Sequence, residues 1–588
     1  MKTNNFQLKV RIIFCLIVSF ALIMVVRLYF LQIVYGENYT EKADRQYTNI
    51  SVDTYDRGSI FFSDKNGATL SAAGLKTGYI LAINTKLMAT DTDTTDYYNK
   101  ISAIIPLDAG DFYSKVSKVN DPYEVLAKEI SEDDIKKISD LNLPGLVISQ
   151  ENWRYYPGDS LASNIIGFVG YNDSGTSLEG RYGLEKYYDD NLKRDDSDMY
   201  VNSFAEIFSN IKNNFVDPTN READIVTTID PEVQDYVEKE IAATNQKWHS
   251  QTTGAIVIDP NTGEIYAMAT YPTFNANDFK SETNVGVFGN PLISNAYEMG
   301  SIVKPLTMAV GLDTGVVTAT STYNDTGFIK VDGSTIHNYD GRARGVIDMQ
   351  QILNQSLNVG ASYVATKIGK QDFLKYFEAY GIGSETGIDL PNEAAGNISN
   401  LLNNLNNSKQ VEYDTASFGQ GISMTPIITA SALSVLANGG KLVIPHVVKE
   451  IDYKVGLSKK VDYTDEAKQV LKPSTSEEIT RMLVRVVDEA LANGKRKMPN
   501  YSIAAKTGTA QIARPASEGG GYYPDKYLHS FFGYFPAYNP RFLVFLYTFE
   551  PEDSSNPQAD EYASQTLTDP FFDITHFLIN YYEIQPDR

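Results

Sequence analysis

Three short motifs carry side chains that together could transfer an acyl group through a serine. Ser301 and Lys304 form the first motif, Ser356 and Asn358 the second, and Lys506-Thr507-Gly508 the third. A serine hydroxyl is a poor nucleophile at neutral pH and needs a base within hydrogen-bond reach, and the residue three positions later on a helix lies one turn away. We therefore predict that Lys304 is the general base that activates Ser301.

Lys304 can act as a base only if its pKa falls from about 10.4 towards neutrality. Burial lowers the pKa of a lysine, and a second cation nearby lowers it further. The neighbours of Lys304 in the sequence are apolar, and Lys506 is the candidate for the second cation. Gly300 allows a tight entry into a helix whose N-terminal N–H groups could stabilise an oxyanion.

The second and third motifs supply groups for proton transfer and substrate binding. We predict that Ser356 relays a proton between Lys304 and the leaving amine, and that Asn358 holds a substrate amide. Because side chains alternate along a strand, Lys506 and Gly508 should share one face, where the glycine would let a substrate backbone approach closely.

The predicted strand through the third motif also presents groups to an anionic substrate. The ammonium group of Lys506 can bind a terminal carboxylate together with the hydroxyls of Thr507 and Thr509. The N–H group of Thr509 can join that of Ser301 in an oxyanion hole.

Each motif has a second copy elsewhere in the chain, at Lys76-Thr77-Gly78, Ser209-Asn210-Ile211-Lys212 and Ser554-Ser555-Asn556. The copy at Lys76 comes before any candidate nucleophile in the sequence. The copy at Ser209 is not followed by a helical pattern, and the copy at Ser554 lies in an acidic segment predicted to be a loop. For Ser301 alone, an ordinary helix cap is the competing interpretation. The common order of the three motifs favours the catalytic interpretation.

Composition excludes several other classes of protein. The 588 residues carry a net charge of -23, which would repel nucleic acid. The single cysteine, Cys15, permits no disulfide or thiolate metal site in the rest of the chain. The five histidines lack zinc-site spacing, so we expect neither a metal nor another cofactor.

The N-terminal segment predicts a membrane anchor. Residues 11–34 contain an apolar run long enough to span a bilayer as a helix, and Lys2, Lys9 and Arg11 lie at its start. The positive-inside rule places residues 1–10 in the cytoplasm and exports the remainder. A cleaved signal peptide is the alternative, but no small-x-small cleavage site follows the apolar run.

The exported part predicts a mixed α/β (α+β) fold in two parts. Residues 35–225 show short strands, turns and a charged helical segment from Val125 to Leu143, which together indicate an irregular α+β module. Residues 226–588 begin and end with strand patterns and contain helical patterns between them, which predicts one antiparallel sheet covered by helices. The predicted strands are Ile225 to Asp230, Gly254 to Asp259, Ile265 to Ala269, Ala504 to Gln511, His529 to Ala537 and Arg541 to Glu550, and the predicted helices are Val303 to Leu312, Met349 to Ile368 and Pro426 to Ala437.

The three motifs and several further markers make the chain resemble a class B penicillin-binding protein along almost its whole length. The markers are Arg27-Leu28, Leu31-Gln32, Asp56-Arg57-Gly58-Ser59-Ile60, Arg154-Tyr155-Tyr156-Pro157-Gly158, Gly183-Leu184-Glu185, Thr228-Ile229-Asp230 with Gln234, and Gly419-Gln420-Gly421-Ile422. The resemblance implies a monofunctional peptidoglycan DD-transpeptidase anchored in the bacterial plasma membrane. In that family's fold, residues 35–225 would form an elongated pedestal of the dimerisation type, and residues 226–588 would form the transpeptidase domain. Its substrates would be stem peptides on lipid-linked precursors, β-lactams would acylate Ser301, and a SEDS-type membrane glycosyltransferase would be its partner.

The chain departs from the family pattern beside the nucleophile. Met299 stands where the family usually has proline, and Ile302-Val303 replace Thr-Phe, so the cleft there and its β-lactam sensitivity can differ. The glycosyltransferase domain of class A relatives would precede the transpeptidase domain and carries a motif that contains a histidine. The first histidine of this chain is His249, inside the predicted 226–588 region, so that domain is excluded. Two other functions stay open: a serine hydrolase, either a DD-carboxypeptidase or a β-lactamase, and a non-catalytic scaffold that activates a membrane glycosyltransferase.

Overall fold

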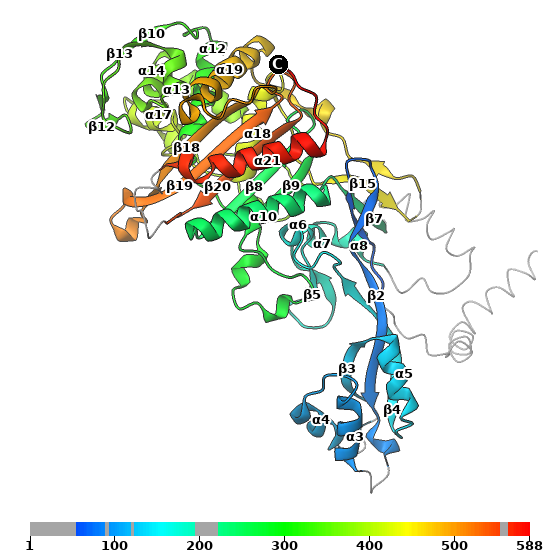
Figure 1. The fold of residues 1–588 in the computed structure, drawn as a ribbon. Coiled ribbons are helices and arrows are strands. Elements are labelled where there is room, and N and C mark those ends of the chain that lie inside the picture. Colours follow the sequence, from blue (N-terminus) through cyan, green and yellow to red (C-terminus); the bar gives the residue numbers. More distant parts are fainter. Residues whose placement is uncertain are drawn as a thin grey trace, which may run out of the picture. The chain divides into compact units, whose positions relative to one another are not determined.

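The computed structural model describes residues 55–88, 93–118, 121, 123–194, 222–454, 456–552 and 562–588 (Figure 1). These residues form two compact units. One comprises Tyr55, Asp56 and the described residues of 76–153, and the other comprises Arg57–Leu75 and the described residues of 154–588. In the described part of the chain no helix is both long and apolar enough to cross a bilayer. The predicted anchor at residues 11–34 and Cys15 lie outside the described residues.

The smaller unit is a sheet covered by three helices. The second half of β2 (Thr69–Ile83) pairs with β3 (Glu124–Ile130) and β4 (Leu146–Tyr155). The helices α3 (Thr94–Ser102), α4 (Ala109–Val116) and α5 (Glu132–Asp140) bury apolar side chains against it. Each helix begins at a residue whose side chain accepts a backbone N–H, namely Asp93, Asp108 and Ser131.

The prediction of a helix from Val125 to Leu143 is wrong in its first half. Residues 124–130 form β3, because their main chain completes hydrogen bonds with β2, and α5 starts only after the Ser131 cap. Pairing with a distant strand therefore overrides the local helical pattern.

The larger unit contains a small sheet that joins distant segments of the chain. β1 (Ile60–Ser63) runs antiparallel to the start of β2 and parallel to β7 (Ala223–Thr227), which pairs antiparallel with β15 (Val448–Tyr453). The strand predicted from Ile225 to Asp230 begins and ends earlier. Its last residue, Asp230, instead caps α10 (Pro231–Trp248) by accepting the N–H groups of Glu232 and Val233.

A five-stranded antiparallel sheet forms the centre of the larger unit, in the order β18-β19-β20-β8-β9. Its strands come from both ends of the predicted 226–588 region, as expected: β8 (Thr252–Ile258), β9 (Ile265–Tyr271), β18 (Ala504–Ala513), β19 (Tyr522–Phe535) and β20 (Phe542–Phe549). α10 and α21 (Thr568–Tyr581) pack on one face, and α18 (Pro426–Ala437) lies in the core on the other (Figure 1). β18 is an edge strand of this sheet, and it contacts residues between Gly300 and Arg485 that are mostly helical.

The helical region places the first two motifs. A 3-10 turn, η6 (Gly300–Val303), leads into α12 (Lys304–Asp313), close to the helix predicted there. The single helix predicted from Met349 to Ile368 is wrong, because α13 (Met349–Asn354) and α14 (Asn358–Ile368) are separated by residues 355–357. The helix predicted from Pro426 to Ala437 is confirmed as α18.

Candidate active site

The backbone around Ser301 is held against β18 by a glycine. Gly300 has a φ of 64°, and a Cβ there would lie 2.6 Å from the carbonyl oxygen of Thr509. The N–H of Gly300 also donates to the carbonyl oxygen of Gly419 at 3.2 Å. Only glycine fits this close, left-handed approach, which brings the backbones of Ser301 and Thr509 next to each other.

Ser301 and Lys304 are in hydrogen-bond contact. The Nζ of Lys304 donates to the Oγ of Ser301 at 2.8 Å and to the carbonyl oxygen of Ser356 at 2.7 Å. Because residues i and i+3 eclipse in a 3-10 turn, η6 places the two side chains on the same side. Lys304 itself is buried, with 1% of its surface exposed.

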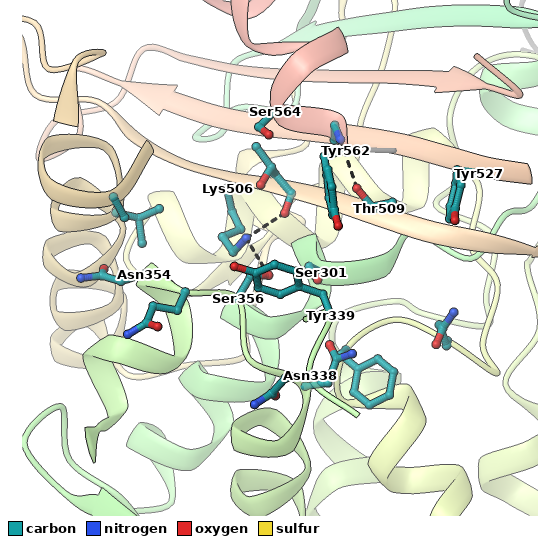
Figure 2. Close-up of a pocket in the computed structure, with 18 of the residues that line it drawn as sticks. Ser301, Asn338, Tyr339, Asn354, Ser356, Lys506, Thr509, Tyr527, Tyr562 and Ser564 are labelled. Carbon is teal, nitrogen blue, oxygen red and sulfur yellow. Dashed lines mark hydrogen bonds between the residues drawn. The ribbon is translucent and has the colours of Figure 1, made fainter. Parts of the chain in front are cut away.

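Ser356 connects the two motif lysines. Its Oγ accepts a hydrogen bond from Lys304 at 3.2 Å. It also accepts one from Lys506 at 3.1 Å (Figure 2). Ser356 has a φ of 54°, in the left-handed region that non-glycine residues rarely adopt. This conformation interrupts the helix and directs both the carbonyl and the hydroxyl of Ser356 towards Lys304.

The buried lysines have lowered pKa values. Burial, reinforced by the positive charge of Lys506, lowers the pKa of Lys304 well below its usual value. Burial alone lowers the pKa of Lys506 to about 7. Burial therefore favours the neutral amine in both lysines, and the positive charge of Lys506 favours it further in Lys304, which lies beside Ser301.

Asn358 lines the same cavity at the start of α14. Its Nδ2 donates to the carbonyl oxygen of His337 at 3.0 Å, in the strand β12 (Ser334–His337). Asn338, which the sequence analysis missed, accepts the N–H of Val359 at 3.1 Å and donates to the carboxylate of Asp325. Asn338 thus links the start of α14 to Asp325 by hydrogen bonds between distant segments, and no sequence motif identifies such contacts.

β18 places the third motif beside Ser356. Lys506, Thr507 and Thr509 line the cavity, and the Oγ1 of Thr509 accepts the N–H of Ala563 at 3.1 Å. Gly508 is not among the described residues of the lining. A Cβ at Gly508 would clash with the Oγ of Ser530 and lie 2.8 Å from the carbonyl oxygen of Met299. The missing side chain of Gly508 therefore makes room for the turn that carries the nucleophile. That this glycine also lets a substrate backbone approach closely stays a prediction.

The cavity around these residues has a volume of about 820 Å³. Tyr339, Tyr527 and Tyr562 form part of its wall (Figure 2), and the rings of Tyr339 and Tyr562 meet edge to face at 6.1 Å between centroids. Gln420 also lines it, within a marker that the sequence analysis listed without assigning a role. The three tyrosines carry no sequence signal because each comes from a different segment.

Of the second copies of the motifs, the structure describes only that of the third motif. Lys76-Thr77-Gly78 lies on β2 in the smaller unit, where the Oγ1 of Thr77 donates to the Oδ1 of Asn152 at 2.7 Å. Ser209 to Lys212 and Ser554 to Asn556 lie outside the described residues.

Comparison with known proteins identifies the class of protein that this fold and site define. Residues 253–572 match the penicillin binding protein transpeptidase domain, and residues 54–220 match the penicillin-binding protein dimerisation domain. The chain therefore belongs to the penicillin-binding proteins, within class B. The predicted boundary near residue 225 falls between the two matched regions and stays a prediction.

The relatives include proteins of sporulation and of peptidoglycan synthesis. The chain is 28% identical over 561 residues to stage V sporulation protein D of Bacillus subtilis, covering 94% of this chain and 83% of that protein. It is 27% identical over 545 residues to the peptidoglycan D,D-transpeptidase MrdA of Acinetobacter baumannii, covering 84% and 77% of the two chains.

Solved structures show the same fold. Penicillin-binding protein 2X of Streptococcus thermophilus gives a TM-score of 0.70 at 19% identity, covering 90% of this chain and 81% of that one. Penicillin-binding protein 3 of Mycobacterium tuberculosis, complexed with aztreonam, gives a TM-score of 0.65 at 22% identity, covering 91% and 98%.

Proposed function

We infer that this class B penicillin-binding protein is a peptidoglycan D,D-transpeptidase, and we propose Ser301 as its nucleophile. The observation that carries the assignment is the 2.8 Å hydrogen bond between Ser301 and Lys304, in which the pKa of the lysine is lowered by burial and by Lys506. A base of this kind is what a serine nucleophile requires.

In the acylation step, neutral Lys304 accepts the proton of Ser301 as its Oγ attacks the penultimate D-alanyl carbonyl of a stem peptide. The N–H groups of Ser301 and Thr509 stabilise the oxyanion. Ser356, which contacts both lysines, passes the proton to the leaving amine of D-alanine. The product is an ester between Ser301 and the donor stem.

The remaining site residues bind the substrate. Lys506, with Thr507 and Thr509, receives the terminal carboxylate, and Asn358 holds an amide of the donor stem. β-Lactams carry a carboxylate and a reactive carbonyl, so they acylate Ser301 in place of the stem peptide.

We propose that the transpeptidase reaction takes place outside the cell, at the outer face of the membrane to which the N-terminal segment anchors the protein. Residues 11–34 form a single transmembrane anchor in the bacterial plasma membrane, residues 1–10 are cytoplasmic, and residues 226–588 form the extracytoplasmic transpeptidase domain. The pedestal of residues 35–225 offers a surface to a SEDS-type membrane glycosyltransferase. The apolar run with basic residues at its start and the match to a dimerisation domain support this arrangement.

Labelling with a fluorescent penicillin, followed by mass spectrometry of the adduct, tests the assignment. We expect one adduct, on Ser301, which Ser301→Ala abolishes and Ser209→Ala leaves intact. Adduct formation on another serine would contradict the site. Rapid, repeated β-lactam hydrolysis would instead indicate a serine hydrolase. A hydrolase needs a base that activates water against the acyl-enzyme, and the described residues that line the cavity include no carboxylate.

A further inference from the structure

The cavity extends along β18 in both directions from the reacting groups. Asn354 and Tyr527 both line it and lie on opposite sides of Ser356 and Lys506 (Figure 2). The catalytic roles proposed above involve neither end. The end at Asn354, which we call the Asn354 arm, is lined by Asn354, Gln355, Val486, Ala490, Leu491 and Ala492.

One wall of the Asn354 arm has an unusual backbone. α19 (Pro473–Arg485) continues into a π-helix at Val486–Ala490, and the next turn contains Ala492 with a φ of 49° and Asn493 with a φ of 57°. Interruptions of this type cost free energy and are frequent at functional sites. Here they place Ala490, Leu491 and Ala492 at the cavity instead of continuing the helix away from it.

The opposite wall presents two side-chain amides that are held in place. Asn354 accepts a hydrogen bond from Gln350 at 2.9 Å and donates one to Glu489 at 3.3 Å. Gln355 accepts one from Arg344 at 3.1 Å and donates one to Gln351 at 3.0 Å. The described lining of the arm is therefore neutral, with amides on one side and small or aliphatic groups on the other. Such a surface suits a peptide better than a second carboxylate.

The direction of the reaction determines which peptide enters the arm. The carboxylate that Lys506 binds belongs to the leaving D-alanine, so the leaving residue lies towards the Lys506 end and the donor stem extends towards Tyr527. By microscopic reversibility, the attacking amine enters where the leaving amine departed. The chain that carries that amine then extends past Lys506, towards Asn354.

From this geometry we propose that the Asn354 arm binds the acceptor stem peptide, whose free amine completes the cross-link. This proposal rests on the proposed transpeptidase function. The amine nitrogen bonds to the acyl carbon while the bond from that carbon to the Oγ of Ser301 breaks. The proton released by the amine passes through Ser356 and Lys304 and returns to Ser301, so the products are an amide and the free serine.

The experiment separates acylation from acceptor use. The purified full chain is given an acyl-D-alanyl thioester as donor and a synthetic stem peptide with a free side-chain amine as acceptor. The products distinguish aminolysis from hydrolysis of the acyl-enzyme, and fluorescent penicillin measures acylation independently. Ala492→Trp introduces bulk into the arm, Ala492→Gly suits the left-handed backbone without bulk, and Ala516→Trp is a control at an exposed alanine outside the lining.

Two fold-changes are compared for Ala492→Trp: the loss in the ratio of aminolysis to hydrolysis, and the loss in the rate of penicillin acylation. We expect the first loss to be at least ten times larger than the second. Ala516→Trp should keep the ratio of the natural chain, and Ala492→Gly should lower the ratio less than Ala492→Trp does. An unchanged ratio in Ala492→Trp overturns the proposal, and so does an equal loss of acylation, because the arm would then serve the donor. Absence of any adduct on Ser301 in the natural chain would instead overturn the proposed function.

Discussion

At the scale of single residues, the site depends on how two lysines share one serine. Lys506 both binds the hydroxyl of Ser356 and lowers the pKa of Lys304 through its charge. The pair therefore works best in a definite protonation state, with Lys304 neutral and Lys506 charged. Each lysine makes a different prediction for the pH dependence of acylation.

The second-order rate of acylation by penicillin should follow a bell-shaped pH profile. The rate rises with pH as Lys304 loses its proton and becomes a base. It falls again around pH 7, because the pKa of Lys506 is about 7 and the cation that binds the carboxylate is lost above that value. Stopped-flow or quenched labelling from pH 5 to pH 10 measures the descending limb around pH 7.

Two variants of Lys506 test this explanation. In Lys506→Arg the descending limb should disappear, since a guanidinium stays charged over the whole range, although its different shape lowers the absolute rate. In Lys506→Ala acylation should fall about 10- to 100-fold, in line with the loss of a charged hydrogen bond worth about 1.5–3 kcal/mol. A descending limb that persists in Lys506→Arg would assign that limb to another group.

Ser356 should contribute its hydroxyl to acylation and its backbone strain to stability. Ser356→Gly and Ser356→Ala both remove the proton relay, so both should acylate about 100-fold more slowly or worse, since general acid–base catalysis contributes about 100-fold or more. The two variants should differ in stability. Glycine relieves the strain of a φ of 54°, whereas alanine retains it, a difference of about 1 kcal/mol in the free energy of unfolding.

Acylation rates and urea unfolding of the two variants give the two readouts. The carbonyl of Ser356 still accepts from Lys304 in both, so the base stays in position. Acylation at the natural rate in Ser356→Ala would exclude the relay.

At the scale of elements, close packing of η6 against β18 sets the position of the nucleophile. Gly508→Ala should lower the free energy of unfolding by about 1–3 kcal/mol, the usual cost of overpacking, and should also slow acylation because the turn at Ser301 is displaced. Gly74→Ala is the matched control, a strand glycine where the nearest atom to a new Cβ is the Oγ of Ser71 at 3.4 Å. Thermal unfolding and penicillin labelling of both variants provide the comparison.

If Gly508→Ala loses stability but acylates at the normal rate, the position of Ser301 in η6 does not depend on the close packing at Gly508. Equal effects of the two substitutions would show that strand glycines matter here for their flexibility and not for the space they leave.

The sequence predicts those elements whose signals are local. The β8–β9 hairpin follows from two apolar runs on either side of a turn that contains Pro260 and Gly263, and α18 follows from an apolar run opened by Pro426. The break at Ser356 has no local signal, since it is stabilised by the distant side chains of Lys304 and Lys506. The motif residues of the site were identified from their order, but Asn338 and the tyrosines reach the cavity only through tertiary packing.

At the scale of the whole molecule, the larger unit joins segments that the sequence analysis assigned to separate parts. β1, from the predicted pedestal, pairs with β7, which in turn pairs with β15 of the predicted transpeptidase domain. Next to this sheet, a buried ion network links Arg57 and Arg154 to Glu185. The family markers at Arg57–Ile60, Arg154–Gly158 and Gly183–Glu185 therefore belong to the same compact unit as the active site.

Glu185 should be essential for the stability of this unit. Its carboxylate accepts from Arg57 at 2.7 Å and from Arg154 at 2.6 Å, and its side chain is 0% exposed. Glu185→Gln keeps the shape of the side chain but leaves two buried guanidinium groups with one fewer anion. Removing one partner of a buried ion pair costs about 3–5 kcal/mol, and we expect a loss of that size in urea unfolding.

Asp173→Asn provides the control for this prediction, because Asp173 is paired with Arg181 but its side chain is 93% exposed. An exposed pair contributes about 0–1 kcal/mol, so this variant should unfold close to the natural chain. The acylation rate per folded molecule should stay the same in Glu185→Gln, since Glu185 does not line the cavity. A stable Glu185→Gln variant would mean that Asp189, which lies 2.9 Å from Arg57, compensates the buried charge by itself.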